Sequence, residues 1–228
     1  MSLAIFDLDN TLLAGDSDYE WGRFLVDQGV VQAATYEQEN RRFYAQYKAG
    51  TLDIHEFARF AYQPLAANPL DALYRWRASF VEERIAPIIL PRGRALIQQH
   101  RAQGHVPVII TSTNRFVTEP IARALEVDHL LASEPEFRQG RYTGALDGVP
   151  CFREGKITRL REWLAQTGYD LNDSWFYSDS HNDIPLLERV SHPVAVDADE
   201  MLARHASERG WPLISLRDPH AEPTSIHR

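Results

Sequence analysis

Two carboxylates stand two positions apart near the start of the chain. Asp7 and Asp9 directly follow the short apolar run 3–6. Alternate residues of a strand point to the same face, so both side chains would lie on one side of the strand end. Buried carboxylates need compensation, and such a pair suits a divalent cation with one group left for proton transfer. An acidic turn that caps a helix is the alternative, and these residues alone leave both interpretations open.

A second acidic pair, Asp179 and Asp183, follows another apolar run at 174–177. A parallel sheet can bring this loop beside Asp7. Carboxylates from two strand ends suit Mg²⁺ that bridges to a phosphate, because this ion takes few protein ligands and keeps its other positions for water and substrate. The alternative is a polar turn that opens a helix at residue 184, with Asn182 or Asp183 as its cap.

Two further polar residues occupy comparable positions. Thr111 ends the apolar run 108–110, and Lys156 follows Gly155 at the start of a helical pattern. A hydroxyl with the backbone amides after it can hold phosphate oxygens, and a lysine can neutralise both a phosphate and a crowded carboxylate. Taken singly, Thr111 is more typical of a turn threonine, and Lys156 is more typical of a solvent-facing lysine.

The elements that must position these residues alternate between strands and helices. Short apolar runs, each followed by a helical pattern, predict strands at 3–6, 106–110, 174–177 and 194–196. Residues with helical spacing predict helices at 91–103, 115–125, 156–166 and 199–208. This alternation predicts an α/β fold with a Rossmann-like parallel sheet flanked by helices. Ligands bind beyond the carboxyl ends of the strands in such sheets, where the polar residues above would meet.

The segment 15–89 has a different pattern, with no strand-like run. It shows four amphipathic helices, whose aromatic stripes we expect to form the core of a bundle; they include Trp21, Phe24, Phe43, Tyr47, Phe57, Phe60, Trp76 and Phe80. We therefore predict an inserted α-helical bundle cap domain at 15–89, on a core domain made of 1–14 and 90–228. A single mixed α/β domain is the alternative. A hairpin is expected at 137–142, and loose order in the tail from Arg217 onward.

Composition excludes several classes of protein. The 228 residues include 24 basic and 32 acidic side chains, a formal net charge of −8, which argues against a nucleic-acid partner. No apolar run approaches the ~20 residues that span a bilayer, and the apolar start is too short for a signal peptide. The single cysteine, Cys151, excludes a disulfide framework. We expect a cytoplasmic protein with no membrane partner.

Together, four stretches resemble the motifs of the haloacid dehalogenase-like superfamily, in the order that the family has them. They are Phe6–Thr11, Ile109–Ser112, Gly155-Lys156 and Ser178–Asp183. A helical insertion directly after the first motif is similar to the cap of the phosphoserine-phosphatase-like branch. The fourth motif departs from that branch, because Ser178 and Ser180 stand where glycines are common.

The resemblance implies a Mg²⁺-dependent phosphomonoesterase. Asp7 would be the nucleophile that forms an aspartyl phosphate, and Asp9 the general acid and base. The implied metal residues are Asp7, Asp9 through its main-chain carbonyl, Asp179, and Asp183 as the residue that orients the metal shell. The implied phosphate-binding residues are Thr111, Ser112, Lys156 and Asn182. Dehalogenases of the superfamily lack the second aspartate, so Asp9 favours phosphate esters.

The substrate would be chosen by the cap, whose entrance carries Asp16, Asp18 and Glu20. These acids could recognise an amine or an imidazole, or they could simply favour a helix start. The residues of the motifs resemble those of a bacterial group that includes histidinol-phosphate phosphatases. A small phosphorylated metabolite, histidinol phosphate, is therefore the expected substrate.

Other functions stay open. Phosphoserine carries a carboxylate and would need a cap arginine, and four are available at Arg23, Arg41, Arg42 and Arg59. A phosphoserine phosphatase or another small-metabolite phosphatase is therefore an alternative. A phosphotransferase and a non-catalytic binding protein are further ones.

Overall fold

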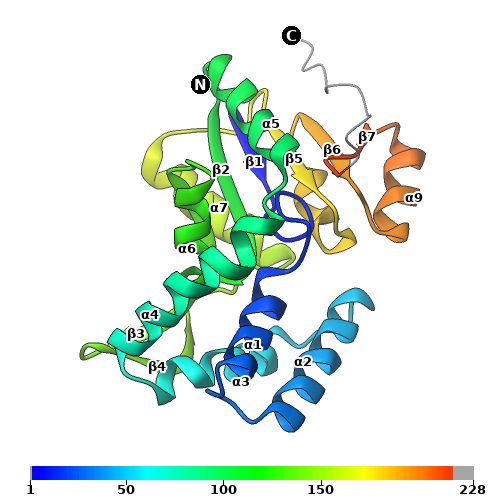
Figure 1. The fold of residues 1–228 in the computed structure, drawn as a ribbon. Coiled ribbons are helices and arrows are strands. Elements are labelled where there is room, and N and C mark those ends of the chain that lie inside the picture. Colours follow the sequence, from blue (N-terminus) through cyan, green and yellow to red (C-terminus); the bar gives the residue numbers. More distant parts are fainter. Residues whose placement is uncertain (1, 218–228) are drawn as a thin grey trace.

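A computed structural model describes residues 2–217 of the chain. Within this range one sheet of seven strands has the order β4-β3-β2-β1-β5-β6-β7 (Figure 1). The strands are β1 (Leu3–Phe6), β2 (Val106–Asn114), β3 (His129–Arg138), β4 (Arg141–Asp147), β5 (Trp175–Ser178), β6 (His192–Val196) and β7 (Leu213–Ile214). All neighbouring strands are parallel except β3 and β4. The predicted α/β fold with a parallel sheet is confirmed.

β1 lies at the centre of the sheet, and every one of its side chains is buried. It pairs with β2 on one side and β5 on the other, with Phe6 opposite both Ile109 and Tyr177. A strand covered on both faces reads as a continuous apolar run, as 3–6 does. The loops after β1, β2 and β5 therefore leave the sheet side by side, which brings three of the four motifs to one edge.

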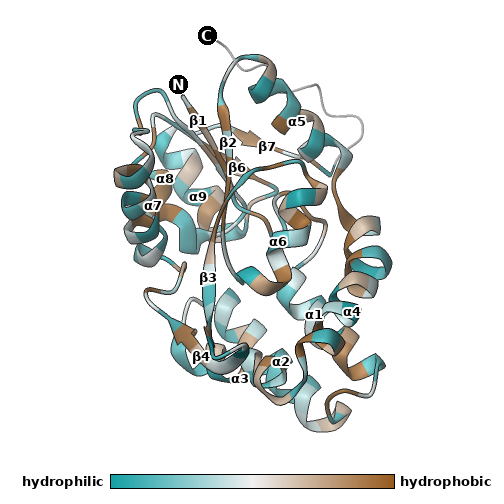
Figure 2. Cartoon of the chain, turned by 90° about the vertical axis from the view of Figure 1, so that its left-hand side faces the viewer, coloured by the Kyte–Doolittle hydropathy of each residue, from teal (hydrophilic) through white to brown (hydrophobic). Residues whose placement is uncertain are grey.

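Helices cover both faces of the sheet (Figure 2). The helices that follow the strands are α5 (Pro91–Ala102), α6 (Arg115–Ala124), α7 (Glu154–Thr167), α8 (Ile184–Leu187) and α9 (Glu200–Arg209). Phe6 packs with residues of α5 and α6 in one apolar cluster, and Ile5 packs with residues of α7, α8 and α9 in another. Alternation of side chains along β1 thus supplies both layers.

The segment between β1 and α5 is helical, as predicted, and lies below the carboxyl ends of the strands in Figure 1. Its helices are α1 (Ser17–Asp27), α2 (Ala33–Lys48), α3 (Ile54–Ala67) and α4 (Leu70–Phe80), followed by a π-helical turn, η1 (Val81–Ile85), and a 3₁₀ turn, η2 (Ala86–Ile88). Leu13 and Ile89 form a bridge where the chain leaves and re-enters the sheet layer. The division into a cap and a core domain stays a prediction.

The predicted hairpin is present and longer than expected. Arg138 pairs with Arg141 across the turn, and Gln139 and Gly140 have φ of 49° and 78°, as a tight hairpin turn requires. β4 packs along α3, where a Cβ on Gly144 would lie 3.3 Å from the Ala66 Cβ. The hairpin therefore packs against the helical segment and supports it, a contact that the apolar stripes alone did not predict.

The C-terminal tail is described only at its start. The expectation of loose order concerns mainly residues 218–228, which lie outside the described range. Among the helices of residues 2–217, none combines the length and the apolar character needed to cross a membrane.

Candidate active site

Asp7 and Asp9 lie at the carboxyl end of β1 in different surroundings. Asp7 is buried, and its Oδ1 accepts a hydrogen bond from Lys156 Nζ at 2.8 Å. Asp9 is held by neutral donors: Ser17 N donates to its Oδ1 at 2.7 Å, and Thr113 Oγ1 to its Oδ2 at 2.8 Å. The acidic pair therefore contains one carboxylate beside a cation and one that faces the start of α1.

Lys156 reaches Asp7 because the chain folds back tightly before α7. A Cβ on Gly155 would lie 2.0 Å from the Pro150 carbonyl oxygen, so only glycine fits there. Lys156 Nζ lies 2.8 Å from Asp7 Oδ1 and 2.7 Å from Asp183 Oδ2. This contact settles the choice left open for Lys156, which is buried and faces the site rather than solvent.

Burial and charge shift the pKa values of this pair. Burial raises the pKa of Asp7, and the charges of Asp183 and Asp9 raise it further, although Lys156 opposes them. Burial disfavours the charged form of Lys156, but Asp183 and Asp7 outweigh it and raise the pKa of the lysine. Lys156 is therefore a fixed positive charge beside Asp7 at neutral pH.

The loop after β5 brings Asp179 and Asp183 to the same place. Asp179 Oδ1 accepts from Thr11 Oγ1 at 3.1 Å, and Asp183 Oδ2 accepts from Ser178 Oγ at 2.7 Å as well as from Lys156. Asp183 precedes α8 but makes no side-chain cap bond, so the alternative of a simple helix cap does not describe it. The sheet has brought the two acidic pairs together.

Asn182 is engaged differently from the implied phosphate ligand. Its Oδ1 accepts from Arg153 Nε at 2.9 Å, and its Nδ2 donates to the Tyr47 carbonyl at 3.3 Å and to Ser180 Oγ at 3.2 Å. Both ends of this amide are thus occupied by protein groups.

The end of β2 supplies a row of polar residues, two of which the sequence analysis did not single out. Thr111 Oγ1 lies 3.3 Å from Asp9 Oδ2, and Ser112 lines the cavity described below. Thr113 holds Asp9 more closely. Asn114 caps α6 through its Oδ1 and directs its Nδ2 to Asp18 Oδ1 at 3.3 Å. β2 extends to Asn114. The consecutive polar residues 111–114 were the sequence signal that could have identified Thr113 and Asn114 as site residues.

The three acids of the predicted cap entrance have separate positions. Asp16 accepts from the backbone N–H groups of Asp18 and Tyr19 and so caps α1, which was the alternative for this stretch. Asp18 is turned into the cavity. Glu20 lies 3.4 Å from Arg23 and is not among the residues that line the cavity.

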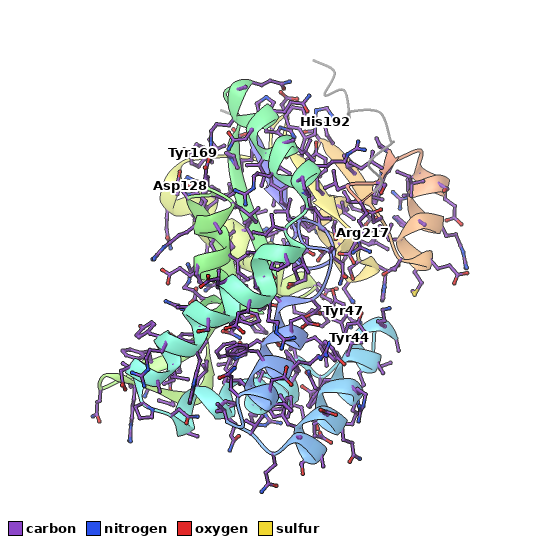
Figure 3. The ribbon with its side chains drawn as sticks, viewed as in Figure 1. Tyr44, Tyr47, Asp128, Tyr169, His192 and Arg217 are labelled. Carbon is purple, nitrogen blue, oxygen red and sulfur yellow. The ribbon has the colours of Figure 1, made fainter. Side chains whose placement is uncertain are left out.

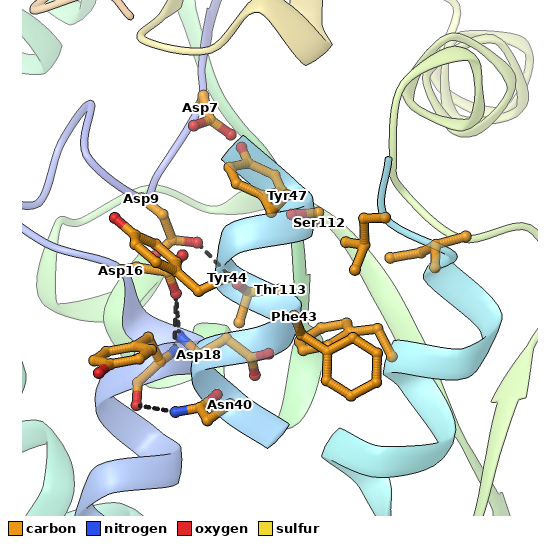
Figure 4. Close-up of a pocket in the computed structure, with 14 residues that line it drawn as sticks. Asp7, Asp9, Asp16, Asp18, Asn40, Phe43, Tyr44, Tyr47, Ser112 and Thr113 are labelled. Atoms are coloured by element: carbon orange, nitrogen blue, oxygen red, sulfur yellow. Dashed lines mark hydrogen bonds between the residues drawn. The ribbon is translucent and has the colours of Figure 1, made fainter. Parts of the chain in front are cut away.

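A cavity of about 550 Å³, solvent at its mouth included, lies between Asp7 and the helices α1, α2 and α3 (Figure 4). Its lining residues are Asp7, Asp9, Asp16, Asp18, Tyr19, Asn40, Phe43, Tyr44, Tyr47, Leu52, Ile54, Phe57, Ser112 and Thr113. These side chains are acidic, aromatic, aliphatic or neutral polar, and none of them is basic. Phe43, Tyr47 and Phe57 were expected inside a helical bundle, but here they form a wall of the cavity.

The acidic groups fit a divalent cation. Burial raises the pKa of Asp179 well above its ordinary value, and repulsion from Asp7 and Asp183 raises it further. A cation between Asp7 and Asp179 would relieve this repulsion. No group of three acidic, histidine or cysteine side chains within residues 2–217 is arranged to hold a metal ion. An ion here would therefore need main-chain oxygen and water, which Mg²⁺ accepts.

Known proteins resemble this chain along most of its length. The model of the family described as haloacid dehalogenase-like hydrolase matches residues 4–188. A protein of Neisseria meningitidis serogroup C (strain 8013) named histidinol-phosphatase is 43% identical over 220 residues, which cover 95% of this chain and 99% of that protein.

Solved structures agree with this match. A crystal structure of a protein of unknown function from Bordetella pertussis Tohama I has a TM-score of 0.89 at 42% identity, and covers 94% of this chain and 98% of that one. A phosphoserine phosphatase solved as a phospho-aspartyl intermediate analogue has a TM-score of 0.69 at 19% identity, over 95% of this chain and 93% of that one. The latter likeness shows a common fold.

Proposed function

Because this chain belongs to the haloacid dehalogenase-like hydrolases, as one of the family's phosphatases, we propose that it hydrolyses histidinol phosphate with the help of Mg²⁺. The observation that carries the choice of substrate is the cavity beside Asp7, which has acidic and aromatic walls and no basic side chain. Histidinol phosphate carries an amine and an imidazole and no carboxylate. The relative named histidinol-phosphatase supports the same substrate.

In the proposed reaction Asp7 and Asp9 have successive roles. Lys156 holds Oδ1 of Asp7, so Oδ2 attacks phosphorus. As this bond forms, the bond between phosphorus and the ester oxygen breaks, and that oxygen takes a proton from Asp9. Water then gives a proton to Asp9 and attacks phosphorus, the bond between phosphorus and the Asp7 oxygen breaks, and inorganic phosphate leaves with Asp7 restored as a carboxylate.

The neighbouring residues would hold the transferring group. Lys156, the Ser112 amide and Thr111 would meet the phosphoryl oxygens. Asn182, expected as a further phosphate ligand, would instead hold the loop after β5 in place, because both ends of its amide are bonded to protein groups. Mg²⁺ would be held by Asp7, Asp179 and the main-chain carbonyl of Asp9, with Asp183 orienting its shell. When bound, the ion would offset the negative charge of the phosphoryl group.

Asp18 is the group best placed to recognise the amine of the leaving alcohol. Burial and repulsion from Asp9 raise the pKa of Asp18 to about 7, and the hydrogen bond from Asn114 only partly opposes them. A cationic substrate group beside it would favour the ionised carboxylate. Aromatic rings such as Tyr19 and Tyr44 give a cation or an imidazole a stacking surface.

Phosphoserine fits the cavity less well. Its carboxylate would need a basic partner, and Arg23, Arg41 and Arg42 pair with glutamates instead. Phosphoserine and other small metabolites, transfer of the phosphoryl group to a second alcohol, and binding without catalysis stay as outcomes of the test. We further propose that 15–89 is the substrate-selecting cap, that 1–14 and 90–228 form the core, and that the enzyme acts in the cytoplasm.

Phosphate release from a panel of esters tests the proposal. The panel contains histidinol phosphate, phosphoserine, a sugar phosphate and an aryl phosphate, each with Mg²⁺ and again with EDTA. We expect the highest kcat/KM for histidinol phosphate and loss of turnover in EDTA. A preference for phosphoserine would contradict the substrate, and turnover unaffected by EDTA would contradict the metal. Absence of phosphate release from every ester would contradict the proposed hydrolase activity.

A further inference from the structure

Tyr47, on the last turn of α2, stands between two cavities at the candidate active site. It lines the cavity of Asp7 and Asp9, and it also lines an open depression of about 1030 Å³ beside Asp179. Its hydroxyl donates to Ser180 Oγ at 3.2 Å. Figure 3 shows Tyr47 and Tyr44 at the junction between α2 and the sheet layer. The side chains of Tyr47 and Tyr44, which line both spaces, therefore lie in the wall between them.

The guanidinium of Arg153 contributes to holding the end of α2 in this place. Arg153 Nε donates to Asn182 Oδ1 at 2.9 Å, and Arg153 Nη2 donates to the carbonyl of Gly50. Asn182 links Arg153 to α2, because its Nδ2 donates to the Tyr47 carbonyl. Carbonyl oxygens at the end of a helix carry partial negative charge, which favours a cation there. Arg153 thus joins the loop after β5 to the end of α2.

The backbone on both sides of this contact has an uncommon conformation. Arg153 has φ 51° and ψ −123°, which is costly for a residue with a Cβ. Gly50 has φ +68°, and a Cβ there would lie 3.0 Å from His181 Nε2 and 3.1 Å from Arg153 Nη2. The positive φ favours glycine at position 50, and a strained arginine is kept on the other side of the contact.

Noncovalent contacts have to position this end of α2. The chain connects the helical segment to the sheet layer near Leu13 and Ile89, and the Asp9 to Ser17 hydrogen bond fixes the start of α1 beside that connection. The end of α2 lies more than thirty residues from either connection along the sequence. Its contacts with the loops of Arg153 and Asn182 are what hold it against the site.

We propose that Arg153 is a positioning residue that fastens the end of α2 over the reaction centre, so that Tyr47 separates the substrate cavity from the depression beside Asp179. The role of Arg153 in catalysis rests on the proposed function, while the fastening itself does not. Loss of the guanidinium would raise the population of a form in which α2 is released and the substrate cavity is open.

Hydrogen exchange of the 228-residue chain tests the fastening without any substrate. The variants are Arg153→Gln and Arg153→Gly, and the control is Arg161→Gln, which changes an exposed arginine on α7, the helix that Arg153 precedes. We expect amide exchange in residues 46–53 to rise about tenfold in both Arg153 variants, as loss of a charged hydrogen bond implies, and to stay unchanged in the control. Glycine accepts φ 51° without strain, so Arg153→Gly should still fold.

Two results would overturn the fastening. One is exchange in 46–53 that stays at the wild-type rate in Arg153→Gln. The other is faster exchange in Arg153→Gln but not in Arg153→Gly, since backbone disturbance rather than the lost guanidinium would then be the cause.

Steady-state kinetics with histidinol phosphate test the catalytic consequence. Apparent affinity falls in proportion to the closed fraction of free enzyme, and a tenfold rise in opening lowers that fraction by at most tenfold, so we expect KM to rise by up to about tenfold and kcat to stay within about twofold. A fall in kcat at constant KM would mean that Arg153 acts by placing Lys156 three residues on, which contradicts the proposal. Absence of wild-type turnover with every ester would refute the proposed function, and the exchange experiment would still decide the role of Arg153.

Discussion

Asp7 and Asp9 lie two residues apart and yet touch opposite kinds of group. A buried lysine contacts Asp7, whereas hydroxyls and a backbone N–H hold Asp9. A carboxylate beside a fixed positive charge is suited to attack phosphorus, and one held by neutral donors is suited to exchange a proton. The difference arises from β2 and α7, which are distant in sequence.

Asp7→Asn is expected to abolish turnover of every ester, because an amide cannot form the aspartyl phosphate. Folding should survive, since burial already disfavours the charge of Asp7 and Lys156 keeps Asp183 as its partner. Phosphate release and thermal melting measure the two effects. Turnover close to wild type would contradict Asp7 as the nucleophile.

Asp9→Asn should instead slow both steps by about 10²-fold or more.

Asp18→Asn is expected to raise KM for histidinol phosphate about tenfold, the worth of one charged hydrogen bond. KM for an aryl phosphate, whose leaving group carries no charge, should not change, because that ester has no amine to recognise. Glu20→Gln is the matched control, since Glu20 faces Arg23 rather than the cavity. Equal effects of Asp18→Asn on both esters would show that Asp18 does not bind the amine.

At the scale of elements, the turn before α7 determines where Lys156 lies. Gly155 lies against the Pro150 carbonyl, and this contact directs the first turn of α7 toward Asp7. Gly155-Lys156 is recognisable as a motif in the sequence. The reason for the glycine became visible only when the backbone contact with Pro150 was known.

Gly155→Ala is expected to destabilise the protein by about 1–3 kcal/mol, because the new Cβ must displace backbone, and to lower kcat through the shifted Lys156. Gly104→Ala is a control for strain alone, since Gly104 has φ +79° but no atom within 4 Å of the added Cβ. Denaturant unfolding and phosphate release measure the outcome. Full activity of Gly155→Ala would show that the turn does not place Lys156.

At the scale of the whole molecule, the end of the sheet opposite the active site carries a histidine cluster. His100 contacts His105 through the two Nδ1 atoms at 2.8 Å and the Tyr177 hydroxyl through Nε2 at 2.8 Å. His192 stacks on Trp175 in the same region, far from Tyr47 in Figure 3. Burial, with the neighbouring His105, lowers the pKa of His100 to about 3.

This shift predicts a pH dependence of stability. The unfolded chain protonates His100 below about pH 6.5, whereas the folded chain does so only near pH 3. The contribution of His100 is therefore complete above pH 6.5 and is lost as the pH falls toward 3. Comparison of wild type with His100→Gln removes the effect of other groups, including the buried carboxylates of the active site, whose raised pKa values act in the opposite direction.

The unfolding free energy of wild type relative to His100→Gln should fall by about 1.4 kcal/mol per pH unit between pH 6 and pH 4. Urea unfolding at each pH gives the two values. A difference that does not vary with pH would show that His100 titrates normally in the folded chain.

Much of the architecture could be read from the sequence alone. β1 coincides with the predicted strand at 3–6, α5 and α6 begin at the predicted residues, and the hairpin turns at Gln139 and Gly140. These features depend on hydrophobic period and turn residues, which act between neighbours in the chain. The positions of Asp7 and Asp183 after predicted parallel strands also indicated that they meet at one edge of the sheet.

Tertiary structure alone decided which side chains of the helical segment face the site. Asp18 and Glu20 lie on the same helix in equally acidic surroundings, but the way α1 meets Asn114 turns only Asp18 into the cavity. Tyr47 has the helical spacing of a core aromatic, and the packing of α2 against Asn182 and Arg153 makes it a wall of the site instead. Periodicity determines which residues share a face, whereas the partner of that face depends on contacts between residues that are distant in sequence.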